Sequence, residues 1–266
     1  MSTLRPLTVV TGASSGIGFE LAREAAIHGH DLIVCAEDHA IDGAAARLEG
    51  YEVEVYAVRT DLSTYAGAET LVREVRASRR PPHTVMLNAG IGHGGAFLDA
   101  ELADLTRVID LNIASTVHLC RRLLEDLVAQ GEGRILVTSS VAAETPGPYH
   151  AVYNASEAFL RSFGSALRTE LVGSGVTVTV LMPGPTDTRF FVRSGLLGTR
   201  LGRSRKDDPA LVARQAYEAL VSGRAEVVAG SLHTRAQELA MHVLPERAKA
   251  TLHRRLAEPG GSRSHL

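Results

Sequence analysis

Three glycines with a fixed spacing, Gly12, Gly16 and Gly18, follow the short apolar run 7–11 and precede a segment of helical periodicity. Glycine allows a tight turn at positive φ and lets the backbone approach a bound group closely. The helix that follows offers free N–H groups and the positive end of its dipole to an anion. Because strand, loop and helix come in this order at the start of a βαβ unit, the segment predicts a pyrophosphate site for a dinucleotide rather than a simple tight turn.

An acidic pair, Glu37-Asp38, ends the second apolar run of the chain. Glu37 stands 19 residues beyond Gly18 (37 − 18), and a carboxylate at about this distance typically binds the ribose 2′-hydroxyl of NAD. The same charge would repel the 2′-phosphate of NADP. Either acid could equally be a solvated loop charge.

The elements that must position these residues alternate along the chain. Seven short runs rich in Val, Ile and Leu occur at 7–11, 31–36, 53–58, 84–88, 134–139, 176–182 and 226–229, and helical patterns occur at 16–28, 66–78, 101–129, 152–172 and 209–222. Continuous apolar runs suit strands buried on both faces, and their alternation with helices indicates repeated βαβ units. We therefore expect a single-domain α/β fold: a Rossmann-like, doubly wound parallel sheet of about seven strands with helices on both faces.

Two segments interrupt this alternation. Residues 188–207 lack a clear strand and carry six basic residues among small ones, which favours a mobile, solvated surface insertion or a functional loop. Residues 231–266 have the pattern of one or two amphipathic helices packed on the domain or on a partner subunit. We assign residues 1–230 to a dinucleotide-binding domain that includes a substrate loop at 188–207. Residues 231–266 form a C-terminal helical tail, of which 259–266 are expected to be disordered.

From about residue 6 to residue 230, the sequence resembles the short-chain dehydrogenase/reductase family. The glycine spacing matches that family, and further motifs follow in order: Thr60-Asp61-Leu62, Asn88-Ala89-Gly90, Asn112, and the segment 183–188 with the sequence PGPTDT. The resemblance implies a cofactor site formed by Gly12, Ser14, Ser15, Gly16, Ile17, Gly18, Glu37, Asp61, Leu62, Asn88, Ala89, Gly90, Tyr153, Pro183, Gly184, Thr186 and Thr188. Some of these residues also have purely structural interpretations. Asp61 could cap a helix, Asn88 could be a turn residue, and Asn112 could bond local backbone.

A serine and a tyrosine thirteen residues apart, Ser140 and Tyr153, resemble the catalytic pair of the family. Reduction of a carbonyl by hydride leaves alkoxide charge that a positioned tyrosine can protonate, while Ser140 holds the same oxygen. By the same resemblance, Asn112 kinks its helix and anchors a water. The sequence departs from the family at residue 157, where Glu157 replaces the usual lysine.

This replacement has a calculable effect. Residues 153 and 157 lie one helical turn apart, where a unit charge contributes roughly 3 kcal/mol, or about 2 pKa units, at an effective dielectric of about 20. A carboxylate therefore raises the tyrosine pKa that a lysine would lower. Tyr153 can still act as an acid in reduction, but it becomes a poor base for alcohol oxidation. Three interpretations stay open: an active reductase with altered chemistry, a catalytically impaired nucleotide-binding scaffold or regulator, and a knock-out of an ordinary enzyme.

NAD(H) is the favoured cofactor, with NADP(H) as the second option. Relatives that prefer NADP often carry an arginine near the position of Glu37 or a basic residue near Ser15, and the sequence has neither there. The resemblance also implies a homodimer or homotetramer. A small carbonyl or alcohol substrate is expected beside Ser140, enclosed by residues 142–150 and 188–207. Candidate lining residues are His93, Phe97, Glu144, Tyr149, His150, Phe190 and Phe191.

Composition excludes several other classes of protein. With 45% hydrophobic and 22% charged residues, the chain is an ordinary globular one, and its 28 Lys+Arg against 30 Asp+Glu give no argument for nucleic acid as a partner. The two cysteines, Cys35 and Cys120, form no disulfide framework or zinc cluster, and we expect buried reduced thiols and no metal. Neither a signal peptide nor an apolar run of about 20 residues is present, so we expect a cytoplasmic protein without an integral membrane segment.

Overall fold

Seven parallel strands form one sheet in the order β3-β2-β1-β4-β5-β6-β7. The computed structural model describes residues 5–258, with backbone only at 237–239 and 242, so the expected disorder of 259–266 lies outside the described residues. The strands are β1 (Leu7–Thr11), β2 (Asp31–Ala36), β3 (Val55–Arg59), β4 (Thr84–Leu87), β5 (Gly133–Thr138), β6 (Val176–Pro183) and β7 (Glu226–Ala229). The fold class expected from the sequence is confirmed.

The direction of winding reverses at β1, which pairs with β2 on one side and with β4 on the other. In open parallel sheets, ligands bind in the crevice at the carboxyl ends of the strands where the winding reverses. The glycine segment follows β1, and Asn88 follows β4. The topology thus brings both segments to the edge of the sheet where a ligand site is expected.

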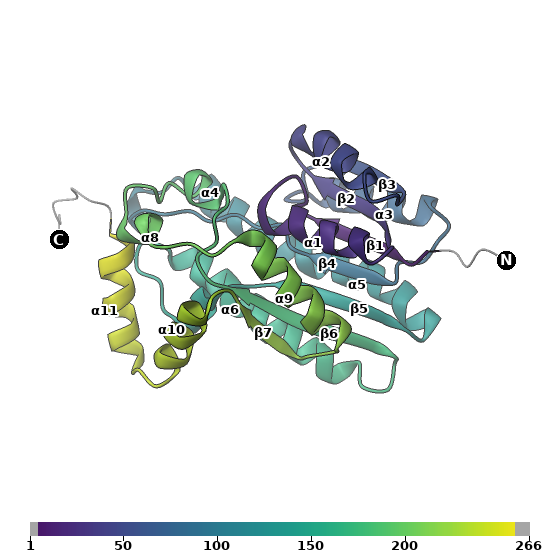
Figure 1. The fold of residues 1–266 in the computed structure, drawn as a ribbon. Coiled ribbons are helices and arrows are strands. Elements are labelled where there is room, and N and C mark those ends of the chain that lie inside the picture. The colour runs from purple at the N-terminus through teal and green to yellow at the C-terminus, as the bar shows by residue number, and fades with distance from the viewer. Residues whose placement is uncertain (1–4, 259–266) are drawn as a thin grey trace.

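Helices cover both faces of the sheet (Figure 1). One layer holds α1 (Gly16–Ile27), α2 (Ala40–Glu49) and α9 (Pro209–Val221), and the other holds α3 (Tyr65–Ala77), α5 (Ser115–Gln130) and α6 (Ala151–Glu170). Side chains of a strand alternate between the two layers, so that Val10 belongs to the first core and Val9 to the second. Both cysteines are buried, and burial raises the pKa of each thiol to about 12.

The elements differ from the sequence-based expectations at two places. Helix α2 was not predicted, because its alanines and single glycine give only a weak apolar pattern. The predicted helix 101–129 is divided into α4 (Leu102–Ile109), a π-helical turn (Asp110–Ala114) and α5. Such a turn widens the helix by one residue and often marks a functional site. Asn112 lies at its centre.

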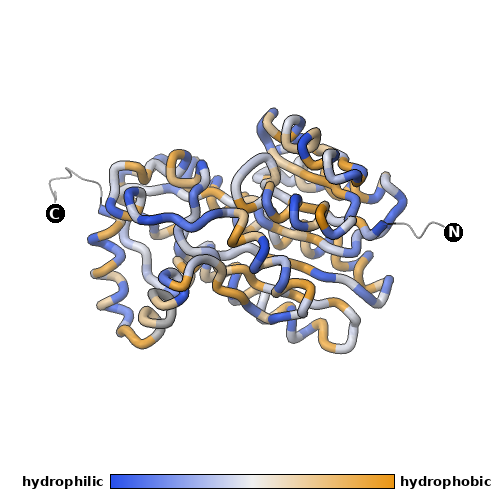
Figure 2. The backbone as a smooth tube through the Cα atoms, viewed as in Figure 1, coloured by the Kyte–Doolittle hydropathy of each residue, from blue (hydrophilic) through white to orange (hydrophobic). Residues whose placement is uncertain are grey.

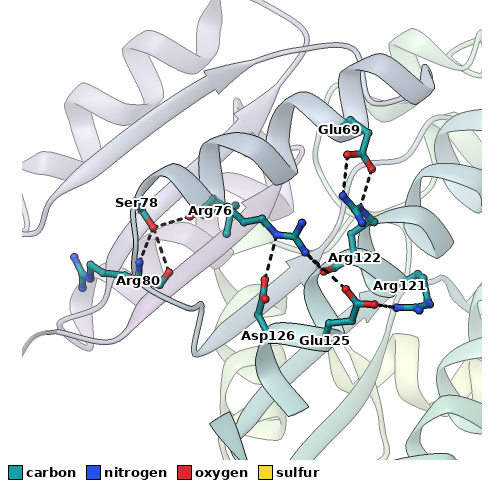
Figure 3. A network of polar contacts seen from close by, with 9 residues as sticks. Glu69, Arg76, Ser78, Arg80, Arg121, Arg122, Glu125 and Asp126 are labelled. Atoms are coloured by element: carbon teal, nitrogen blue, oxygen red, sulfur yellow. Dashed lines mark hydrogen bonds and ion pairs between the residues drawn. The ribbon is translucent and has the colours of Figure 1, made fainter. Parts of the chain in front are cut away.

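Ion pairs tie α5 to α3 on the outside of the second layer (Figure 3). Arg76 of α3 approaches Glu125 and Asp126 of α5 at 3.7 Å each, and Arg122 of α5 contacts Glu69 of α3 at 2.9 Å. Pairs as exposed as these contribute little individually, but they form a network. They join the middle and the C-terminal half of α5 to α3.

Residues 188–207 are not the solvated insertion that the sequence favours. They contain two short helices, α7 (Phe190–Arg193) and α8 (Arg200–Arg203), and they bury Phe191, Leu196 and Thr199. The segment packs on the protein through only part of its apolar residues. Phe191 and Leu196 are buried, whereas Val192 and Leu197 are exposed, as are most of the basic residues that suggested solvation.

The C-terminal tail folds back on the domain. Helices α10 (Leu232–His242) and α11 (Glu246–Ala257) lie at the end of the molecule opposite the N-terminus, with α11 beside α8 (Figure 1). Along α11, hydrophilic and hydrophobic residues alternate from turn to turn (Figure 2). The hydroxyl of Thr234 donates to Asp207 at 2.5 Å, and that of Tyr149 donates to Glu258 at 3.1 Å. These bonds join the tail to the loop at 188–207 and to the segment before α6.

Candidate active site

The turn after β1 is built so that only glycine fits. Gly12 and Gly16 have φ of 68° and 59°, in the left-handed region. A Cβ on Gly18 would lie 2.2 Å from the carbonyl oxygen of Gly12, so α1 packs directly against the turn. A Cβ on Gly16 would lie 2.8 Å from the methyl group of Thr188, which closes over the turn from the other side. The result is a narrow backbone cradle at the N-terminus of a helix, which suits a phosphate.

The end of β4 is locked to the end of β1. The hydroxyl oxygen of Thr11 accepts the backbone N–H groups of Asn88 and Ala89 at 2.9 and 3.0 Å, and the Asn88 amide donates to the Thr11 carbonyl at 3.2 Å. Thr138 of β5 donates to the Asn88 side-chain oxygen at 3.3 Å. Asn88 thus connects the ends of β1, β4 and β5. This role goes beyond that of a turn residue, which was the alternative interpretation of the sequence.

The acidic groups near the adenosine end of the predicted cofactor site are all paired. Glu37 contacts Arg107 of α4, whose guanidinium also donates to Asp61 at 3.2 Å. Asp61 accepts the backbone and hydroxyl of Ser63 at 2.9 and 2.7 Å. Burial alone would raise the pKa of Asp61, but the Ser63 hydrogen bonds and the Arg107 charge together hold it below its ordinary value.

Asp38, the second acid after β2, binds two groups from distant segments. Its Oδ2 accepts the Ser14 hydroxyl at 3.1 Å and the Arg193 guanidinium at 3.2 Å. The sequence argument for NAD considered only the residues near Glu37 and Ser15 in the sequence. The structure adds two arginines from distant positions, since Arg107 and Arg193 reach these acids from α4 and α7.

Asn112 connects the loop after β4 to α6. Its side-chain oxygen accepts the N–H of Ile91 at 2.9 Å, and its amide donates to the Ile91 carbonyl at 3.0 Å and to Ser156 of α6 at 2.9 Å. The side chain is 1% exposed. Its partners are far away in the sequence, so the interpretation as a polar residue that bonds local backbone is wrong.

Ser140 and Tyr153 meet at the carboxyl end of β5. Ser140 begins a short 3₁₀ turn (Val141–Glu144), where its oxygen accepts the N–H of Ala142 at 3.1 Å, and its side chain hydrogen-bonds the Tyr153 phenol. The ring of Phe190 packs against Tyr153 with centroids 5.2 Å apart, and His150 packs edge-on at 5.5 Å. These contacts fix the direction in which the phenol points.

Glu157 follows Tyr153 by one turn of α6 and is 5% exposed. The hydroxyl of Ser139 donates to the Glu157 backbone carbonyl at 2.8 Å, which holds this turn against β5. Burial raises the pKa of the Glu157 carboxyl to about 8. Burial and the neighbouring Glu157 raise the pKa of Tyr153 well above 10, and the Ser140 hydrogen bond offsets only part of that. At neutral pH the site therefore holds a protonated tyrosine beside a mostly protonated glutamic acid.

One cavity of about 540 Å³ joins these parts. Every residue that the sequence assigned to catalysis or to cofactor binding lines it. Of the seven candidate pocket residues, Glu144, His150, Phe190 and Phe191 line it, whereas His93, Phe97 and Tyr149 do not. Phe97 is exposed on the surface, and Tyr149 is turned to Glu258.

Sequence reasoning missed the far wall of this cavity. Met241 of α10, Leu244 of the connection between α10 and α11, and Leu252 and Leu256 of α11 line the same cavity as Tyr153. His253 of α11 lies beside His150, with ring centroids 5.9 Å apart. The apolar pattern of the tail indicated packing but gave no sign that the packed side chains face a cavity.

Two absences hold for the described part of the chain, residues 5–258 without the side chains of 237–239 and 242. Within them, no group of three or more His, Cys, Asp or Glu side chains is placed to hold a metal ion. No helix in that same part of the chain is long and apolar enough to cross a membrane.

Comparison with known proteins decides the family. Residues 6–195 match the family model described as short chain dehydrogenase. The chain belongs to the short-chain dehydrogenase family. Among curated relatives, the probable oxidoreductase EphD of Mycobacterium tuberculosis is 35% identical over 191 residues, 71% of this chain. That match covers 32% of EphD, so the chain spans about a third of the length of this relative. Oxidoreductase UcpA of Salmonella typhimurium is 29% identical over 213 residues, which cover 80% of this chain and 79% of UcpA.

Solved structures of short-chain dehydrogenases match nearly the whole chain. A short-chain dehydrogenase from Sphingobium yanoikuyae in complex with NADPH has a TM-score of 0.80 at 26% identity, and covers 98% of this chain and 99% of its own. A short-chain dehydrogenase/reductase from Burkholderia phymatum in complex with NAD has a TM-score of 0.81 at 25% identity, with 97% and 98% covered. The structural neighbours of this chain thus include complexes with both nicotinamide cofactors.

Proposed function

We propose that this short-chain dehydrogenase uses a nicotinamide dinucleotide to reduce a carbonyl compound to an alcohol, with Tyr153 as the proton donor. The observation that carries the proposal is a single cavity that runs from the glycine cradle after β1 to Ser140 and Tyr153 after β5. Gly12, Gly16 and Gly18 line this cavity without side chains, so the backbone at the N-terminus of α1 is open to a phosphate, which fits a dinucleotide.

Three residues of the chain have distinct roles in the proposed reaction. When bound, the reduced nicotinamide supplies a hydride to the carbonyl carbon. Ser140 donates a hydrogen bond to the substrate oxygen, and Tyr153 transfers its phenolic proton to that oxygen as negative charge develops. Asn112 fixes the loop after β4 and the turn of α6 that holds Ser156, and so sets the position of the tyrosine.

Glu157 favours the reductive direction. A phenol with a raised pKa is fully protonated at neutral pH and is a stronger acid than the alcohol product, whereas oxidation requires a tyrosinate that this site disfavours. A mostly protonated Glu157 adds little negative charge to the ground state. We therefore expect reduction to be retained and oxidation near neutral pH to be slow.

The cavity also indicates the class of substrate. The C-terminal tail contributes four apolar side chains to its wall, those of Met241, Leu244, Leu252 and Leu256. Apolar walls with few polar groups bind apolar ligands and orient them by those few groups. We infer a ketone or aldehyde whose larger substituent is apolar, with His150 and His253 as the polar groups at this end.

The test is consumption of NADH and of NADPH over a panel of ketones and aldehydes with apolar substituents of increasing size. Turnover that is lost in Tyr153→Phe supports the proposal, and turnover unchanged in that variant would refute it. Homo-oligomerisation, which the family resemblance implies, is a separate proposal. Light scattering tests it, and a monomer at assay concentration would contradict it.

A further inference from the structure

The side chain of Arg193 extends from the loop at 188–207 to Asp38, beside the glycine turn. Arg193 is the last residue of α7, and its guanidinium contacts Asp38 Oδ2 at 3.2 Å across 155 positions of sequence. The same carboxylate oxygen accepts the hydroxyl of Ser14, which belongs to the glycine turn. The Arg193 side chain is 45% exposed, lines the cavity and has no second carboxylate among its contacts in residues 5–258.

The charges around the cavity show why this cation matters. Its described lining residues include five carboxylates, on Glu37, Asp38, Asp61, Glu144 and Glu157, and no lysine. A dinucleotide brings further negative charge on its phosphates. The only guanidinium groups among the described lining residues belong to Arg189 and Arg193.

Three of the five carboxylates have partners outside the cavity lining. Arg107 contacts Glu37 and Asp61, and Arg161 contacts Glu144. Burial keeps Glu157 mostly protonated at neutral pH, since it raises the pKa of that carboxyl to about 8. Asp38 is the remaining one, and its partner is Arg193. Asp38 therefore holds Arg193 beside the glycine turn, and among the described arginines only Arg193 contacts Asp38.

Resting on the function proposed above, we propose that Arg193 binds a phosphate of the dinucleotide and thereby fastens the substrate loop over the bound cofactor. A guanidinium is a planar fork of donors that matches phosphate geometry. The loop already touches the glycine turn through the Thr188 methyl group near Gly16. Phe190, three residues before Arg193, packs on Tyr153, so a loop fastened at Arg193 also supports the proton donor.

The experiment is equilibrium binding by calorimetry without a carbonyl substrate. The proteins are the wild type, Arg193→Met, Arg193→Lys and the control Arg200→Met, an exposed arginine of the same loop that does not line the cavity. The ligands are NADH, NADPH, ADP and adenosine. A charge-assisted contact predicts that Arg193→Met weakens binding of the phosphate-bearing ligands by about 10- to 100-fold, with adenosine unchanged and Arg193→Lys intermediate.

Comparison of the four ligands shows which phosphate of the dinucleotide Arg193 binds. Equal losses for NADH, NADPH and ADP identify the diphosphate, and a loss confined to NADPH identifies the 2′-phosphate; both support the inference. An Arg193→Met protein that binds all four ligands as the wild type does would overturn it. So would an equal loss for adenosine, or an equal effect of Arg200→Met. A wild type that binds none of the dinucleotides would instead refute the proposed function itself.

Discussion

Replacement of Glu157 by glutamine should change how the stability of the protein depends on pH. The carboxyl is 5% exposed, and burial raises its pKa from the ordinary 4.5 to about 8. Between these values the folded chain holds a proton that the unfolded chain has lost. The free energy of unfolding therefore falls as pH rises through this interval and levels off above pH 8.

The size of this effect follows from the same two values. At 1.36 kcal/mol per pH unit, the interval from 4.5 to about 8 corresponds to about 5 kcal/mol in total, of which roughly 3 to 4 kcal/mol falls between about pH 5 and pH 8. Buried histidines act in the opposite sense. Burial lowers the pKa of His30 and of His150 to about 4, so their contribution to stability is lost as pH falls below about 6.5. A single pH curve therefore mixes the two effects.

Paired urea unfolding curves of the unliganded protein separate them. Glu157→Gln keeps the shape of the side chain and removes its titration, so the histidine contribution cancels in the difference between variant and wild type. The variant should gain stability relative to the wild type as pH rises from about 5 to 8. Glu170→Gln, an exposed glutamate at the end of the same helix, is the control and should show no such gain. Parallel curves for Glu157→Gln and wild type would refute the burial argument.

Three further predictions concern the cavity. Tyr153→Phe should lower the rate of carbonyl reduction by about 100-fold or more while dinucleotide binding is retained, and a simultaneous loss of binding in calorimetry would argue against a proton-donor role. Gly18→Ala should abolish dinucleotide binding, since the added methyl group would lie 2.2 Å from the Gly12 carbonyl oxygen, and undiminished NADH affinity would contradict this geometry. Asn112→Ala should lower the free energy of unfolding, measured in urea, by about 1–3 kcal/mol, because it leaves the part-buried N–H and carbonyl groups of Ile91 without their partner. An unchanged midpoint would show that water replaces the amide.

The sequence was sufficient to predict the sheet, because parallel strands buried on both faces leave continuous apolar runs. It also located the glycine turn, since the fit of Gly18 against Gly12 excludes any side chain and so restricts the residue type. Most of the residues assigned to the cofactor lie at or just after a strand end, and strand ends of a parallel sheet meet at one edge, whereas Asn112, Tyr153 and Glu157 reach the same cavity from helices.

What the sequence could not predict depends on tertiary contacts between distant segments. Nothing near Asp38 in the sequence indicates that Arg193 lies beside it, so the argument for NAD from the acidic pair was incomplete. Leu252 and Leu256 have the same apolar periodicity whether they face a core, a partner or a cavity. The π-helical turn at Asn112 was likewise not predicted, because the apolar pattern of 101–129 suggested one continuous helix.

The most direct test of the account is a comparison of the wild type with Glu157→Lys, with NADH and NADPH consumption measured on the carbonyl panel and alcohol oxidation measured in parallel. The account predicts that the wild type reduces a carbonyl with an apolar substituent, and that Glu157→Lys moves the rise of alcohol oxidation with pH to lower pH, because it lowers the pKa of Tyr153. A wild type that turns over no carbonyl while Glu157→Lys does would contradict the account, and would show an otherwise intact site in a protein that binds the cofactor without catalysis.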